Sequence, residues 1–195
     1  MGLICICSTA KQEYLKLREP EKKKNILQQQ FSASKPNEIW VSDVTCFKLN
    51  NRYYYVCVIL DLFSRKIISY KISKKNSTQL ITSTFKGAWT QRNLEPGLLF
   101  HSDRGAQYTS HRFQQLLHEH RVIQSFSNSG KPHDNAVAEA FFASFKKEEL
   151  YRRDYASEPE FKKGIDSYIE FYNARRPHRT LKNRTPCQME EDYQK

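Results

Sequence analysis

Three acidic residues occupy positions where acids are unusual, and together they have the chemistry of a metal site. Asp43 lies inside a stretch rich in β-branched and aromatic residues, where an aspartate is unfavourable because such stretches form strands. Asp103 follows a short apolar stretch, and Glu139 lies in the first turns of an expected helix. Neighbouring carboxylates repel each other unless a cation lies between them. Their oxygens suit hard divalent ions such as Mg²⁺ or Mn²⁺.

Such a carboxylate site predicts phosphodiester chemistry. Two divalent ions about 4 Å apart can activate a nucleophile and stabilise the leaving oxygen of an in-line displacement. The alternative is that the three acids have separate structural roles. A chain with 21 acidic residues contains many such trios by chance, and an aspartate at a strand end often serves a turn or a helix cap. Spacing alone leaves both interpretations open.

The composition indicates a basic protein of one main domain. The 195 residues include 32 Lys and Arg against 21 Asp and Glu, a net charge of +11. This balance points first to nucleic acid or an acidic membrane surface as partner, with a merely basic surface as the alternative. The apolar runs are too short to span a membrane. Five cysteines without a CxxC pair indicate free thiols in a reducing cytoplasm.

Hydrophobic patterning predicts an α/β fold around one sheet. The expected strands cover residues 39–49, 52–62, 66–72, 98–102 and 122–126. The expected helices cover residues 77–92, 110–120, 135–153 and 158–173. The first three strands form an antiparallel meander in which the first strand is central. The fourth strand can then add beside it in parallel, which brings the acidic residues toward one place.

The expected helix 135–153 presents two faces. Asn135, Glu139, Phe142 and Lys146 share one of them, and Val137, Phe141 and Phe145 form a stripe for core packing. Glu139 is therefore expected to point away from the core. Lys146, two turns beyond it, can meet a DNA phosphate, with a solvated surface pair as the alternative. Asp134 is the expected N-cap.

The residues around the three acids resemble those of DDE transposases in the retroviral integrase superfamily. Five motifs in the same order carry the resemblance, over about residues 35–190. They cover residues 40–45, 61–65, 101–108, 134–142 and 172–178. The 35 residues between Asp103 and Glu139 also match the usual spacing of that family. The match is closest to bacterial insertion-sequence transposases encoded by two overlapping reading frames, in which this core belongs to the downstream frame.

The resemblance implies a ribonuclease H-like fold with a mixed five-stranded sheet flanked by helices. It implies divalent-metal-dependent DNA cleavage followed by strand transfer. Asp43, Asp103 and Glu139 carry over as catalytic metal ligands for two Mg²⁺ or Mn²⁺ ions, and Lys146 carries over as a DNA contact. The further candidate DNA contacts are Arg104, Lys131, Asn135, Arg176 and His178. Arg104 as a surface turn residue, and His178 as a residue that folds the C-terminal segment onto the core, are the structural alternatives.

The resemblance also implies partners and a domain organisation. The expected partners are the DNA of the element ends and of the target, further copies of the chain, and a DNA-binding protein from the upstream frame. Residues 1–34 are expected to form a helical arm or linker, a remnant of a DNA-binding region. Residues 35–190 are expected to form the catalytic core with a C-terminal helical segment. The location expected is the bacterial cytoplasm, in association with the nucleoid.

Two departures from the family pattern keep other functions open. The region before the core is short, and the Gly-Tyr pair that usually follows the Arg-Pro-His segment is absent. One alternative is a nuclease of the same fold that hydrolyses DNA without joining strands. The other is a truncated DNA-binding remnant without catalytic activity. No N-terminal His-His-Cys-Cys zinc module is present, which argues against a retroviral integrase.

Overall fold

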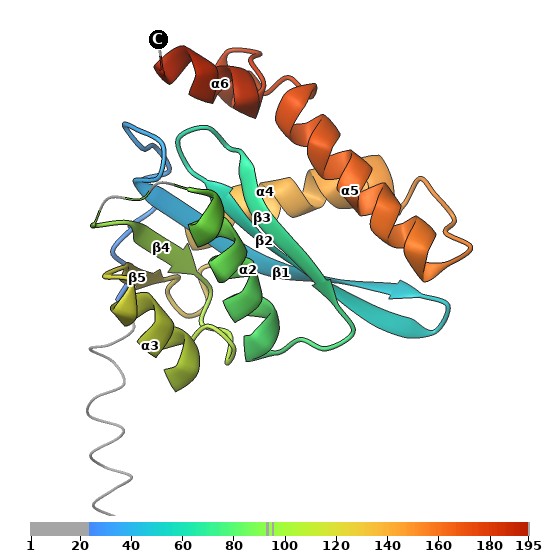
Figure 1. Cartoon of the computed structure of the whole chain (residues 1–195), viewed down its shortest axis with the longest axis horizontal. Helices are drawn as coiled ribbons and strands as arrows, with labels where there is room; N and C mark the ends of the chain where they lie inside the picture. Colours follow the sequence, from blue (N-terminus) through green and yellow to red (C-terminus); the bar gives the residue numbers. More distant parts are fainter. Residues whose placement is uncertain (1–23, 93, 95, 195) are drawn as a thin grey trace, which may run out of the picture.

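Five strands form one mixed sheet at the centre of the protein. The computed structural model describes residues 24–92, 94 and 96–194. Within them the strand order is β3-β2-β1-β4-β5, with helices on both faces (Figure 1). The strands are β1 (Ile39–Leu49), β2 (Arg52–Asp61), β3 (Ile67–Ser73), β4 (Leu99–Ser102) and β5 (Ile123–Phe126). The expected five-stranded sheet is thus confirmed.

The central position of β1 follows from its two neighbours. It pairs with β2 in antiparallel register, through a turn at Asn50 and Asn51 in which both residues have positive φ angles, 46° and 60°. Two consecutive positive φ angles match the twist of a tight hairpin, and asparagine tolerates them. On its other side β1 pairs with β4 in parallel, and β4 pairs with β5 in parallel.

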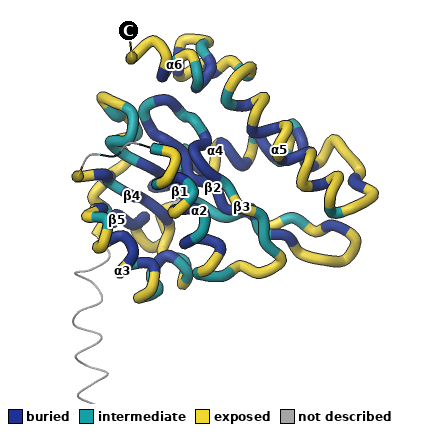
Figure 2. The backbone as a smooth tube through the Cα atoms, in the orientation of Figure 1, coloured by how far each residue is buried: buried dark blue, intermediate teal, exposed yellow. Residues whose placement is uncertain are grey.

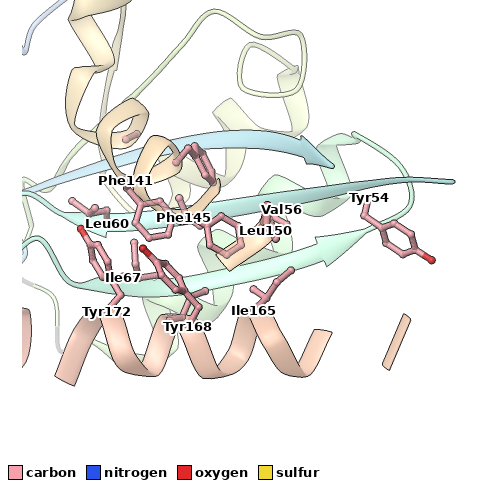
Figure 3. Close-up of a cluster of buried hydrophobic side chains, with 14 of the residues drawn as sticks. Tyr54, Val56, Leu60, Ile67, Phe141, Phe145, Leu150, Ile165, Tyr168 and Tyr172 are labelled. Carbon is pink, nitrogen blue, oxygen red and sulfur yellow. The ribbon is translucent and has the colours of Figure 1, made fainter. Parts of the chain in front are cut away.

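Helices cover both faces of the sheet. They are α2 (Thr78–Gln91), α3 (His111–Glu119), α4 (Ala136–Phe145) and α5 (Glu158–Ala174), and α6 (Pro186–Tyr193) packs against α5. Helices α2 and α3 pack on one face, around Trp40, Phe85 and Phe113. Helices α4 and α5 pack on the other face, where Phe141 and Tyr168 belong to one apolar cluster (Figure 3).

Strand β2 is buried on both faces, which explains its continuous apolar sequence. Residues 56–60 have no exposed area, and they alternate between the two apolar clusters. Figure 2 shows buried residues concentrated on the strands and exposed residues on the outer turns. No helix within the described ranges is long and apolar enough to cross a membrane.

The expectation of a single helix over residues 135–153, capped by Asp134, is wrong in four respects. A 3₁₀ turn (Pro132–Asn135) precedes α4, and a π-helical turn (Lys146–Leu150) follows it. The wider π turn rotates the chain, so that Leu150 packs in the core with 1% of its surface exposed. Phe142, expected on the Glu139 face, is also buried. Asp134 does not cap α4, because its carboxylate binds other segments.

The segment before the sheet packs against the core where it is described. Residues 1–23 of the expected arm lie outside the described residues, and residues 24–30 are not helical. The backbone N–H groups of Ile26 and Leu27 donate to Ser125 Oγ at 2.9 and 3.1 Å. Leu27 is buried in the apolar cluster beneath α4 and α5. Residues 24–30 therefore lie against the end of β5.

Helix α6, which the sequence patterns did not locate, is held by a buried carboxylate. Glu190 accepts hydrogen bonds from Ser64 Oγ at 2.9 Å, Lys66 Nζ at 2.9 Å and Arg92 Nη2 at 2.6 Å. These contacts join α6 to the turn after β2 and to the end of α2. Thr185 and Gln188 form a reciprocal capping box that starts the helix.

We predict that Glu190→Gln lowers the free energy of unfolding by about 2 kcal/mol or more, because it leaves two cations without their buried counter-charge. Urea titration monitored by circular dichroism measures the effect. The matched control is Glu191→Gln at an exposed neighbouring position, for which we expect a change within about 0.5 kcal/mol. Equal losses in the two variants would contradict this role of Glu190.

Candidate active site

One pocket, of about 430 Å³, is lined by all three of the acids singled out above: Asp43, Asp103 and Glu139. Asp43 comes from the middle of β1, Asp103 follows the last residue of β4, and Glu139 lies in the first turn of α4. Residues 127–131, in the loop after β5, form another part of its wall. The three side chains therefore lie in one region of the structure, as the sequence predicted.

The parallel pairing of β1 with β4 brings the two aspartates together. Val41 lies opposite His101 in this ladder, and two residues further along each strand the chain reaches Asp43 and Asp103. Parallel neighbours stay in register as they run the same way, so these two positions are adjacent. Helix α4 reaches the same place because the side chain of Asn135 donates to the main-chain oxygen of Ser42 at 3.2 Å.

The electrostatics of Asp43 reflect this crowding. Burial raises its pKa to about 7, and the negative charges of Asp103 and Glu139 act in the same direction. The Val44 N–H, which donates to Asp43 Oδ1 at 2.7 Å, and the charge of Lys146 act in the opposite direction. Repulsion within the pocket therefore disfavours three ionised carboxylates unless a positive charge is present.

The donor atoms at this pocket fit a hard divalent cation in kind. Three carboxylates face it, and the buried Oδ1 of Asn135 has no hydrogen-bond partner. Among the described residues, no three Asp, Glu, His or Cys side chains are arranged closely enough to hold an ion as they stand. The arrangement thus supplies the chemical donors, and the carboxylates do not yet surround one point.

The predicted DNA contacts fall into two groups. Arg104, Lys131 and Asn135 line the pocket, and Lys146 acts electrostatically on Asp43. The Nε of Arg104 donates to the main-chain oxygen of Ser127 at 2.8 Å, which ties the loops after β4 and β5 together.

Arg176 and His178 lie elsewhere, in the link between α5 and α6. Arg176 makes two hydrogen bonds to Glu148, at 2.7 and 2.8 Å. His178 is 8% exposed, and its ring packs edge-on against Tyr172 at 4.6 Å. These contacts fit the structural alternative, in which His178 folds the C-terminal segment onto the core. DNA contact by either residue stays a prediction.

A layer of buried polar residues supports the pocket from behind. His101 hydrogen-bonds to Ser125 Oγ at 2.9 Å and to Ser127 Oγ at 3.2 Å. Burial lowers the pKa of His101 to about 4, so its ring is neutral near pH 7. His101 does not line the pocket itself.

Asp134 joins the pocket loop to the segment before the sheet. Its carboxylate accepts from the Asn128 N–H at 2.8 Å, from Asn25 Nδ2 at 2.8 Å and from Gln29 Nε2 at 2.6 Å. Sequence reasoning missed this junction and missed residues 127–130 as a pocket wall. The position of the wall was accessible from the sequence, because a fifth strand parallel to the fourth ends at the same edge of the sheet.

The fold and the pocket define a class of protein. Its members have a mixed sheet with acidic residues at the central parallel strands and on the helix beside them. A family model described as integrase core domain matches residues 33–132, and a second with the same description matches residues 120–186. The chain belongs to the integrase core domain family.

The curated proteins that resemble this chain are insertion-sequence transposases. The chain is 39% identical over 84% of its length to a putative transposase InsK for insertion sequence element IS150 from Escherichia coli, and spans 58% of that protein. It is 34% identical over 85% of its length to the transposase for insertion sequence element IS904 from Lactococcus lactis, and spans 66% of it. The chain thus covers less than two thirds of these relatives.

Solved structures agree on the fold. A chain of the simian T-cell lymphotropic virus intasome matches 82% of this chain with a TM-score of 0.71 and 21% identity, over 56% of its own length. The HTLV-2 integrase catalytic core domain in complex with magnesium matches 81% of this chain with a TM-score of 0.65 and 22% identity, over 99% of its own length. The expected ribonuclease H-like fold is confirmed.

We predict that Asp43→Asn changes how the stability of the metal-free protein depends on pH. Between about pH 4 and pH 7 folded Asp43 keeps a proton that the unfolded chain releases, so this group lowers stability as pH rises. The unfolding free energy of Asp43→Asn minus that of the wild type should therefore grow by about 2 kcal/mol or more across this range and stay constant above it.

Urea titrations in chelator at several pH values measure this difference, and the exposed Asp154→Asn variant serves as the control. A difference for Asp43→Asn that is independent of pH would show that the carboxylate ionises normally in the folded protein.

Proposed function

We propose that this chain is the catalytic core of a bacterial insertion-sequence transposase, which cleaves DNA strands and transfers them to a target with divalent metal ions. The observation that carries the proposal is the pocket that Asp43, Asp103 and Glu139 line together. The transposase relatives support the reaction class. The basic charge of the chain, +11, supports a polyanionic substrate.

Asp43, Asp103 and Glu139 would hold two divalent ions, Mg²⁺ or Mn²⁺, and magnesium is named with the similar HTLV-2 integrase catalytic core domain. Bound ions of this kind supply activation of an attacking oxygen and stabilisation of the leaving oxygen. Burial, together with the negative charges of Asp103 and Glu139, raises the pKa of Asp43, and bound cations would offset that negative charge. The attacking groups are water and then a DNA 3′-hydroxyl, so the scheme needs no Ser or Tyr nucleophile.

The remaining pocket residues would bind and orient the DNA backbone. Arg104 and Lys131 place positive charge on the pocket wall, and Lys146 lies beyond Glu139 near the end of α4. Phosphate contacts of this kind fix the register of DNA without selecting its sequence. The hydrogen bond from Arg104 Nε to the main-chain oxygen of Ser127 would hold its guanidinium at the pocket.

We further infer a two-part chain, with residues 1–34 as a segment whose described part packs on the core and residues 35–190 as the core. The partners are the element ends, the target DNA, further copies of the chain and a DNA-binding protein from the upstream frame. Pairing of two DNA ends requires more than one catalytic core. The place of action is the bacterial cytoplasm, at the nucleoid.

We predict that Asp103→Asn and Glu139→Gln each lower strand transfer by about a thousandfold or more, because each removes several kcal/mol of metal-mediated stabilisation. Labelled element-end DNA with Mg²⁺, resolved on denaturing gels, measures cleavage and joining separately. Asp154→Asn is the control and should keep wild-type activity.

The same gels separate the alternatives. Nicked product without joined product from the wild type would indicate a hydrolytic nuclease. Binding without either product, unchanged in the two variants, would indicate a DNA-binding remnant and reject the proposed function.

We predict that Lys146→Ala weakens DNA binding similarly for all sequences and reduces the salt dependence of the affinity by about one phosphate contact. Fluorescence anisotropy at several salt concentrations measures both quantities. Lys86→Ala, at an exposed position on α2 across the sheet, is the matched control. A salt dependence equal to that of the wild type would place Lys146 outside the DNA path.

A further inference from the structure

Ser42, the residue before Asp43, contacts both of the elements that carry the other two acids. Its side chain is fully buried, and its Oγ lies 2.7 Å from the hydroxyl oxygen of Tyr108. Tyr108 belongs to the loop that begins at Asp103. The main-chain oxygen of Ser42 accepts from Asn135 Nδ2, and Asn135 precedes Glu139 by one helical turn.

The direction of the hydroxyl contact follows from the second bond of Ser42. Its Oγ donates to the main-chain oxygen of Val58 at 2.8 Å, so its single proton is used there. The Tyr108 hydroxyl is therefore the donor to Ser42 Oγ. Burial raises the pKa of Tyr108 well above its ordinary value, so this donor keeps its proton.

The ring and the hydroxyl of Tyr108 have separable roles. The ring packs among aromatic side chains, with centroids 6.3 Å from Phe100 and 5.9 Å from Phe113. A phenylalanine at this position would fill the same space. The hydroxyl adds a polar group to a buried site, which is unfavourable unless it is hydrogen-bonded. Its short contact is with Ser42 Oγ at 2.7 Å, directly beside Asp43, and Cys57 Sγ lies 3.9 Å away.

We propose that Tyr108 and Ser42 are positioning residues for the reaction proposed above: their hydroxyl pair fixes the loop that carries Asp103 against the strand that carries Asp43. Neither side chain touches the substrate or the metal in this role. The proposal rests on the proposed function for its effect on catalysis. Its structural part, the attachment of the loop to β1, is testable without any activity.

The first test is Tyr108→Phe in the full chain. We expect the kcat for DNA cleavage and the Mg²⁺ affinity each to fall about tenfold, as for residues that orient metal ligands, while the KM for DNA is unchanged. Calorimetric titration with Mg²⁺ and single-turnover kinetics measure these quantities. Unchanged Mg²⁺ affinity and kcat would overturn the proposal.

A matched variant separates positioning from loss of stability. Tyr155 is also buried, and its hydroxyl donates to Glu149 at 3.0 Å in a part of the structure away from the pocket. Tyr155→Phe should lower the melting temperature at least as much as Tyr108→Phe and leave kcat and Mg²⁺ affinity unchanged. Equal kinetic losses in both variants would assign the effect to stability and overturn the proposal.

A double-mutant cycle tests whether the two hydroxyls act through each other. Ser42→Ala leaves the buried Tyr108 hydroxyl without its oxygen acceptor and with only the weak acceptor Cys57 Sγ at 3.9 Å, so this variant should lose as much kcat as Tyr108→Phe or more. The variant that combines Ser42→Ala with Tyr108→Phe should be no worse than Ser42→Ala alone. Multiplied losses would show that the two side chains act independently and overturn the proposal.

Hydrogen exchange of the metal-free protein tests the attachment itself. We expect amide exchange in residues 103–109 to be faster in Tyr108→Phe than in the wild type, and unchanged in Tyr155→Phe. Faster exchange in Tyr108→Phe would support the attachment of the loop even if the wild type showed no strand transfer. The absence of strand transfer would reject only the proposed function. Equal exchange in Tyr108→Phe and wild type would overturn the positioning role whatever the activity. If Tyr108→Phe does not fold, Ser42→Ala is measured in its place with the same criteria.

Discussion

The parallel pairing of β1 with β4 is the constraint on which the rest of this structure depends. Parallel neighbours require a long crossover, here the connection through α2, and a cover on both faces of the sheet. Val41 and His101, opposite each other in this ladder, are both fully buried. Because the two strands run in the same direction, the residues that follow this pair place Asp43 and Asp103 on one pocket.

The pocket opposes folding, and the core compensates for it. Burial of Asp43 among like charges raises its pKa to about 7, which is a cost whenever the carboxylate is ionised without a cation. Burial of the apolar clusters on both faces of the sheet supplies free energy that offsets this cost. A site of this kind is therefore expected on central strands, where apolar packing elsewhere offsets its electrostatic cost.

Behind the acids lies a second layer of buried polar groups that satisfy one another. His101 joins the ends of β4 and β5, Asp134 joins the pocket loop to residues 25 and 29, and Ser42 joins β1 to its neighbours. Each buried group has partners from other segments, so the layer fixes how loops meet and adds little apolar packing. The chain before the sheet is thereby attached, through Asp134, to the loop that lines the pocket.

The sequence by itself determined the strands, the principal helices and the three acids, since periodicity and local composition act over a few residues. The helix start at Ser77, for example, follows from one side chain that caps its own turn. Tertiary structure alone decided the π turn, the anchoring of α6 and the partners of Asp134 and Arg176. Asp134 binds a side chain 109 residues away, and Arg176 binds one 28 residues away. No local pattern encodes such partners, because they depend on how complete elements pack.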